Sequence, residues 1–86
     1  MDDASLEVFR QVISRLRQGP YPQGETFELC REVLAAAPSS PEAAQALRVL
    51  VEGAMADAHT SISDAQIIMR LLKALDRGEV QPETLL

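Results

Sequence analysis

Cys30 and His59 are the only cysteine and the only histidine in this 86-residue chain. A catalytic cysteine–histidine pair needs both side chains within hydrogen-bond reach and a third group that orients the imidazole. Cys30 falls on the apolar stripe of its predicted helix, where a free cysteine serves as a small buried hydrophobic residue. His59 falls at the end of the next predicted helix, where the helix dipole favours a capping or surface imidazole. A pH-sensitive role for His59 at a dimer interface stays open.

Carboxylates are spread along the predicted second and third helices instead of gathering at one point. No Glu-x-x-His pair is present, which argues against a di-iron bundle, and no glycine-rich phosphate loop follows a strand. We therefore expect no metal, no cofactor and no small-molecule substrate, and we predict that the chain is not an enzyme. The scattered carboxylates are Glu25, Glu28, Glu32, Glu42, Glu52 and Asp57.

Basic residues occur near the ends of two predicted helices. Arg15 and Arg17 close the first helix, with Arg10 one turn earlier, and Arg70, Lys73 and Arg77 close the fourth. If those two ends met, they would form a basic patch on a chain whose formal net charge is −5. Because duplex binding depends on neutralising phosphates, that net charge opposes it. Nucleic acid is therefore an unlikely partner in our prediction, and a nucleic-acid-associated transcriptional regulator is kept as an alternative.

Length and composition indicate one small domain covering residues 1–86. The chain is 47% apolar and 24% charged, and its single cysteine allows no internal disulfide. No apolar run approaches the ~20 residues of a membrane span. The first residues, Met1-Asp2-Asp3, are acidic where a signal peptide would be basic. We expect a cytoplasmic protein that does not associate with membranes.

Turn signals divide the chain into four helical segments, at about residues 5–18, 25–37, 41–58 and 63–77, with a tail at 79–86. Apolar residues recur at helical spacing, and no strict apolar–polar alternation competes. Short connections favour antiparallel neighbours. The predicted fold is therefore all-α, a compact antiparallel four-helix bundle with short loops.

The predicted third helix is apolar on nearly every side. Only Gln45, Arg48 and Glu52 form a narrow polar strip along it. A helix of this kind is covered by several neighbours. We therefore expect it at the centre of the fold or at a subunit interface.

The helix ends carry recognisable capping residues. Ser40 followed by Pro41 predicts the start of the third helix, and Gly19-Pro20 predicts the end of the first. Ser63 with Gln66 predicts a capping box at the start of the fourth helix, with Ile62 and Ile67 as a hydrophobic staple. Gly78 predicts the end of that helix.

The stretch from Thr26 to Ala46 reads TFELCREVLAAAPSSPEAAQA. It resembles the second helix of a tetratricopeptide repeat, its closing proline and the opening of the next repeat, with Leu34 and Pro38 at the family's apolar and proline positions. The stretch departs from the family's pattern at three positions. The family prefers alanine where this chain has Thr26 and Val33, and an aromatic residue where it has Cys30. The likeness covers roughly a quarter of the chain, and the period of about 34 residues is not repeated. It implies stacked helix hairpins and a groove that binds a peptide or a helix of a partner.

These features together predict a small cytoplasmic adaptor, regulator or chaperone-like protein that acts by helix-mediated protein–protein interaction and self-associates as a homodimer. An accessory subunit of a larger enzyme complex is a further alternative. Tyr21, the only tyrosine, lies between prolines as a loop anchor or a binding handle. The predicted partner-binding residues are Tyr21, Leu50, Val51, Ala54, Met55, Leu71, Leu72, Leu75, Leu85 and Leu86.

Overall fold

The computed structural model describes residues 2–19 and 21–86, and these residues form helices with no strand among them. The predicted all-α class is therefore confirmed. Each of the four long helices begins and ends within two residues of its expected bounds, and the tail adds one short helix. The helices are α1 (Asp3–Gln18), α2 (Glu25–Ala36), α3 (Pro41–Ala56), α4 (Ile62–Asp76) and α5 (Pro82–Leu85).

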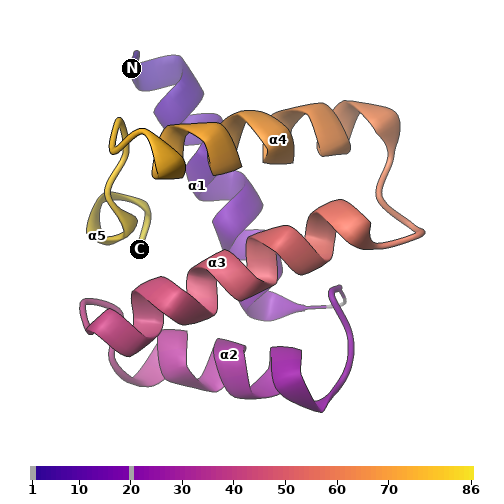
Figure 1. Ribbon diagram of the computed structural model, residues 1–86, viewed down its shortest axis with the longest axis vertical. Helices are drawn as coiled ribbons and strands as arrows, with labels where there is room; N and C mark the ends of the chain where they lie inside the picture. The colour runs from indigo at the N-terminus through magenta and orange to yellow at the C-terminus, as the bar shows by residue number, and fades with distance from the viewer. Residues whose placement is uncertain (1, 20) are drawn as a thin grey trace.

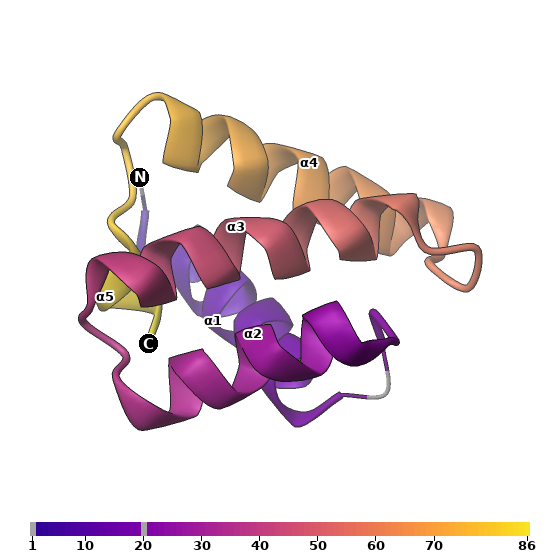
Figure 2. The same cartoon turned by 60° about the horizontal axis from the view of Figure 1, so that its bottom comes forward.

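The long helices form a layer crossed by a single helix (Figures 1 and 2). Successive helices α2, α3 and α4 lie side by side and run in alternating directions, while α1 passes behind them at a steep angle. The expected alignment of four helices in one antiparallel bundle is not confirmed, because α1 crosses its neighbours. Figure 1 looks onto the face of α3 and α4 that faces away from α1, and no described helix covers that face.

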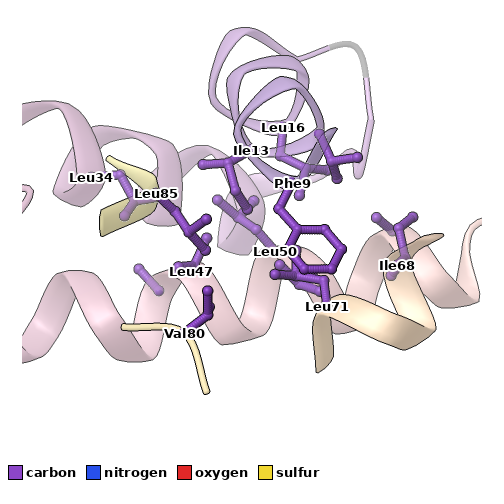
Figure 3. Close-up of a cluster of buried hydrophobic side chains, with 14 of the residues drawn as sticks. Phe9, Ile13, Leu16, Leu34, Leu47, Leu50, Ile68, Leu71, Val80 and Leu85 are labelled. Atoms are coloured by element: carbon purple, nitrogen blue, oxygen red, sulfur yellow. The ribbon is translucent and has the colours of Figure 1, made fainter. Parts of the chain in front are cut away.

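The core lies between α1 and the layer (Figure 3). Phe9 of α1 points toward Leu50 of α3 and Leu71 of α4, and Val80 and Leu85 close one end. All of these side chains are buried, and no buried polar or charged residue occurs among the described residues. A water-excluded interior of apolar side chains is the main favourable contribution to folding.

The helix α3 occupies the centre, as expected for a helix that is apolar nearly all round. It packs against α1, α2 and α4 and contributes to the core with Ala43, Ala46, Leu47, Leu50, Val51 and Ala54. Its polar strip lies on the side that the other helices leave open: Gln45 and Glu52 are exposed, and Arg48 is half-buried.

Several predicted helix ends are confirmed. The Ser40 hydroxyl accepts a hydrogen bond from the Ala43 N–H at 3.0 Å, with Pro41 as the first helical residue. Gly78 follows α4 with a φ of 70°, and its N–H donates to the Leu75 carbonyl at 3.2 Å. The Glu79 N–H donates to the Ala74 carbonyl at 3.0 Å, which completes a Schellman motif. Gly19 ends α1 with a φ of 68°, and the predicted role of Pro20 lies outside the described residues.

The start of α4 differs from the prediction. Ser61, and not Ser63, is the N-cap, because its hydroxyl accepts from the Asp64 N–H at 3.1 Å. The preceding Thr60 hydroxyl donates to the Ala54 carbonyl at 2.6 Å and fixes where the connection from α3 ends. Ile62 thereby becomes the first helical residue and stays 81% exposed, so the predicted staple between Ile62 and Ile67 is wrong. The connection also begins early, since α3 ends at Ala56 and not at Ala58.

Gly53 in the middle of α3 is explained by a close approach of α2. A Cβ at this position would lie 2.5 Å from Cε1 of Phe27 and 3.0 Å from Cγ of Pro22. The same region is tied to α1 by Arg31, whose Nε donates to the Leu16 carbonyl at 3.1 Å and whose Nη2 donates to the Pro22 carbonyl. The connection between α1 and α2 therefore packs tightly against the central helix.

Replacing Ser61 by alanine should lower the free energy of unfolding by about 1 kcal/mol, because an N-cap hydrogen bond is lost. Ser63→Ala is the matched control and should leave the free energy of unfolding within about 0.5 kcal/mol of the original value, because Ser63 lies inside the first turn. Urea denaturation of both variants measures this. A larger loss for Ser63→Ala than for Ser61→Ala would contradict the assigned helix start.

Gly53→Ala should destabilise the protein by about 1–3 kcal/mol, because the added methyl group overlaps the Phe27 ring. Helix propensity alone would give the opposite sign, a gain of up to ~1 kcal/mol. Combining Gly53→Ala with Phe27→Leu should recover part of the loss in the same denaturation experiment. A more stable Gly53→Ala variant would show that α2 and α3 are not in this close contact.

Candidate functional site

The two residues with the most reactive side chains lie in different surroundings. Cys30 is a half-buried residue of α2 that packs against the core. Burial raises the pKa of the Cys30 thiol, while the charge of Arg31 acts weakly in the opposite direction. His59 is exposed in the connection after α3, where its backbone N–H donates to Oδ1 of Asp57 at 2.7 Å. A thiol with a raised pKa is a poor nucleophile at neutral pH.

Neither a metal cluster nor a membrane span occurs in the part of the chain that the structure describes. Within residues 2–19 and 21–86, no three side chains of histidine, cysteine, aspartate or glutamate gather closely enough to hold a metal ion. In the same ranges, no helix has both the length and the apolar character to cross a membrane.

The basic ends of the first and fourth helices do not meet. The end of α1 lies near the start of α4, where Arg15 pairs with Asp64 at 3.6 Å. The end of α4 instead lies near the start of α1. There Nη2 of Arg70 donates to the Ser5 hydroxyl at 3.2 Å, and Cζ of Arg70 lies 6.0 Å from the centre of the Phe9 ring. The combined basic patch considered from the sequence is therefore absent in this arrangement.

A shallow hollow of about 290 Å³ lies where the end of α4 meets the start of α1. Acidic residues share it with the basic ones. Asp2 caps α1 by accepting from the Ser5 N–H at 3.0 Å, and the hydrogen bonds from Ser5 lower the pKa of this carboxyl. Glu79 lies 3.9 Å from Arg77. The hollow is lined by Asp2, Ser5, Phe9, Arg70, Lys73, Ala74, Arg77 and Glu79.

The ten predicted partner-binding residues fall into two groups. Five have side chains within the core of the chain itself and are not at its surface: Leu50, Val51, Ala54, Leu71 and Leu85. The other five are half-buried and pack around the rim of the core: Tyr21, Met55, Leu72, Leu75 and Leu86. A partner can reach only the second group without unfolding the domain.

Two of the four exposed large apolar residues found among the described residues lie on α4. Ile62 is 81% exposed and Met69 is 43% exposed. Together with the half-buried Ala65 and Leu72 they recur at spacings of three, four and three residues, which places them on one side of the helix. We call Ile62, Ala65, Met69 and Leu72 the α4 stripe.

The opposite side of α4 faces the core, through the buried residues Ile68, Leu71 and Ala74. The α4 stripe therefore lies on the side of the helix that is turned away from these core residues. Val8 and Leu29 are also exposed, but Leu29 stands among Glu25, Glu28 and Glu32 on α2. Single exposed apolar residues are common on protein surfaces, and Ile62 and Met69 differ from Leu29 in lying on one side of a helix without a carboxylate between them on that side.

Charged side chains flank the α4 stripe. On the side toward α1, Arg70, Lys73 and Arg77 share the hollow with Asp2 and Glu79. On the side toward α3, Arg48 pairs with both Asp76 of α4 and Glu52 of α3, the second at 3.3 Å. Asp76 follows Met69 by seven residues, so it continues the line of Ile62 and Met69 with a charged group.

Sequence reasoning missed Ile62 and Met69 as candidate residues. Ile62 had been assigned to a hydrophobic staple, and Met69 belonged to no predicted stripe. The signal was present, because Ile62, Ala65, Met69 and Leu72 repeat with heptad spacing beside the core-facing Ile68, Leu71 and Leu75.

Comparison with known proteins gives no significant match to a family model, to a curated protein or to a solved structure. The stretch from Thr26 to Ala46 lies within α2, its connection and the start of α3, and its resemblance to a tetratricopeptide repeat stays a prediction.

The rate of Cys30 alkylation should reach half of its maximum at a higher pH in the folded protein than in urea. In urea this pH should be about 8.5. Because burial favours the neutral thiol, the neutral form adds to the free energy of unfolding. This contribution is full below the pKa of the unfolded protein and is lost as pH rises through the pKa of the folded protein. The rate of reaction with iodoacetamide as a function of pH measures both midpoints. A folded midpoint below the unfolded one would show an activated thiol.

Proposed function

We propose that this chain is a small non-enzymatic adaptor or regulator that binds another protein by helix packing, with the α4 stripe as its docking surface. The observation that carries this proposal is the exposure of Ile62 and Met69 on one side of a helix whose other side is already buried. Burying such side chains against a partner helix is favourable by roughly 25 cal/mol per Å² of apolar surface.

The residues around the α4 stripe support a helix as the bound element. Arg48 of α3 contacts Asp76 of α4, and the two helices run in opposite directions. Half-buried Met55 of α3 and Leu72 of α4 belong to the predicted set and are partly accessible from outside. Methionine side chains are flexible and polarisable, which suits a surface that adapts to a partner.

The surface continues past Arg48 toward α5. A hollow of about 280 Å³ lies there, between the start of α3 and the end of α4. Its apolar lining includes Leu75, Val80 and Pro82, and Gln45 and Gln81 lie at its edge. A partner helix lying along α4 would cover the stripe first and could place its end over this hollow.

A cytoplasmic site of action is part of the proposal. The chain has a single cysteine, and burial raises the pKa of its thiol. Disulfides persist in oxidising compartments and are rare where thiols stay reduced. A small domain held together without one fits a reducing compartment.

The proposal is tested by placing a photocrosslinking amino acid at position 69, with the same residue at position 11 of α1 as a control. Gln11 is exposed on the far side of α1. We expect a protein to be crosslinked in cells through position 69 and not through position 11. The crosslinked protein, this chain or another, is then purified for a binding measurement.

Met69→Glu should weaken binding of that purified protein by at least about tenfold, since it replaces a buried apolar contact by a charge. Gln11→Glu, which adds the same charge elsewhere, should leave the affinity unchanged. Calorimetric titration measures both, and circular dichroism checks that both variants fold. Equal affinity of the two variants, or no crosslink through position 69, would contradict the proposed docking surface.

A further inference from the structure

The hollow between the end of α4 and the start of α1 lies beside the α4 stripe. Lys73 follows Met69 by four residues, so the two side chains are neighbours on the surface of α4. Met69 belongs to the stripe, whereas Lys73 lines the hollow together with Arg70 and Arg77. A protein that covers Met69 therefore also meets this positively charged side of α4.

The cations nearest the stripe are largely without partners. Nη2 of Arg70 donates to the Ser5 hydroxyl at 3.2 Å, and its guanidinium lies over the Phe9 ring. A guanidinium has five N–H donors, so Arg70 keeps several for a further acceptor. Lys73 is exposed and makes no ion pair or hydrogen bond with residues 2–19 or 21–86.

The carboxylates that line the same hollow already have partners. Asp2 caps the start of α1 by accepting a backbone hydrogen bond at 3.0 Å, and Glu79 lies 3.9 Å from Arg77. Three cations and two carboxylates leave the lining of the hollow with one net positive charge. This uncompensated charge lies at Arg70 and Lys73, on a chain whose net charge is −5.

We propose that the helix docked on the α4 stripe carries an aspartate or glutamate side chain whose carboxylate binds Lys73 at the mouth of this hollow, with Arg70 as a second donor. This inference rests on the proposed function and names the chemistry of the partner. A helix that covers Met69 displaces water from the ammonium group of Lys73. A charge that loses water without gaining an opposite charge is unfavourable, so the partner must supply an anion here.

The charge of the hollow favours a carboxylate over a phosphate group. One carboxylate balances one net positive charge, whereas a phosphate brings about 1.5 to 2 negative charges at pH 7 to a hollow that already holds two acids. On the other side of the stripe, Arg48 contacts both Asp76 and Glu52. Each of those charges has an opposite partner within the chain, so the unmet requirement lies at Lys73.

Charge changes at position 73 test the proposal, with the purified protein that crosslinks through position 69 as the probe. Lys73→Gln should weaken its binding about two- to fivefold, because one charge pair is lost. Lys73→Glu should weaken it about tenfold or more, since repulsion replaces attraction. Both effects should shrink between about 0.1 M and about 1 M salt, as the screening length falls from about 10 Å to about 3 Å.

Arg17→Glu is the matched control, because it makes the same change in net charge at the other end of α1. Arg17 makes no ion pair with the described residues and lines a separate hollow with Ser14 and Arg31. This variant should bind the purified protein like the original chain. Calorimetric titration measures all affinities, and thermal melts check that the three variants fold.

Treating the purified protein with phosphatase separates the two kinds of anion. Its affinity for the original chain and for Lys73→Glu should stay unchanged, because the group that meets Lys73 is a carboxylate. Loss of the difference between these two chains after the treatment would assign a phosphate group to the hollow and overturn the proposal.

The outcomes separate this inference from the proposed function. Weaker binding of both position-73 variants, with unchanged binding of Arg17→Glu, supports the acidic partner. The inference is overturned if Lys73→Glu binds as tightly as the original chain, or if Arg17→Glu weakens binding equally. In either case the proposed function still stands when Met69→Glu loses binding, whereas the absence of any crosslink through position 69 contradicts both.

Discussion

The apolar surface of α3 must be covered on several sides at once, and this requirement organises the fold. The helices α2 and α4 flank α3 in a layer, and α1 crosses behind it to close the core around Leu47 and Leu50. Burial of apolar surface is the dominant favourable term in folding. Among residues 2–19 and 21–86, no helix covers the outer side of α4.

The connections are shaped by the same requirement. Close packing of α2 on α3 depends on the missing side chain at Gly53, over which Phe27 and Pro22 lie. Arg31 holds the preceding connection through carbonyls of Leu16 and Pro22. At the other end of α3, Thr60 bonds to Ala54 and sets the first residue of α4.

Much of the fold could be predicted from local patterns. Helix bounds follow from capping residues such as Ser40 and Gly78, whose hydrogen bonds are made within a few residues. Two kinds of feature could not be predicted. The crossing of α1 depends on how its apolar side meets three helices at once. The choice between Ser61 and Ser63 depends on the contact of Thr60 with the end of α3, which lies outside any capping pattern.

The candidate surface was harder to predict than the core. Leu71 and Leu72 are adjacent and equally apolar, but about 100° of helix rotation separates them, so one lies in the core and the other on its rim. Central residues such as Leu50 were expected at an interface because the sequence does not show which side of α3 its own helices cover. The open side becomes visible only when α1, α2 and α4 are in place.

The most direct test of the central claim is the change of backbone amide chemical shifts on addition of the purified protein that crosslinks through position 69. If the outer side of α4 is the docking surface, the shifts should move for the amides of residues 62–73 and stay fixed for α1 and α2. Constant shifts throughout α4, or changes centred on α1 or α2, would contradict the account.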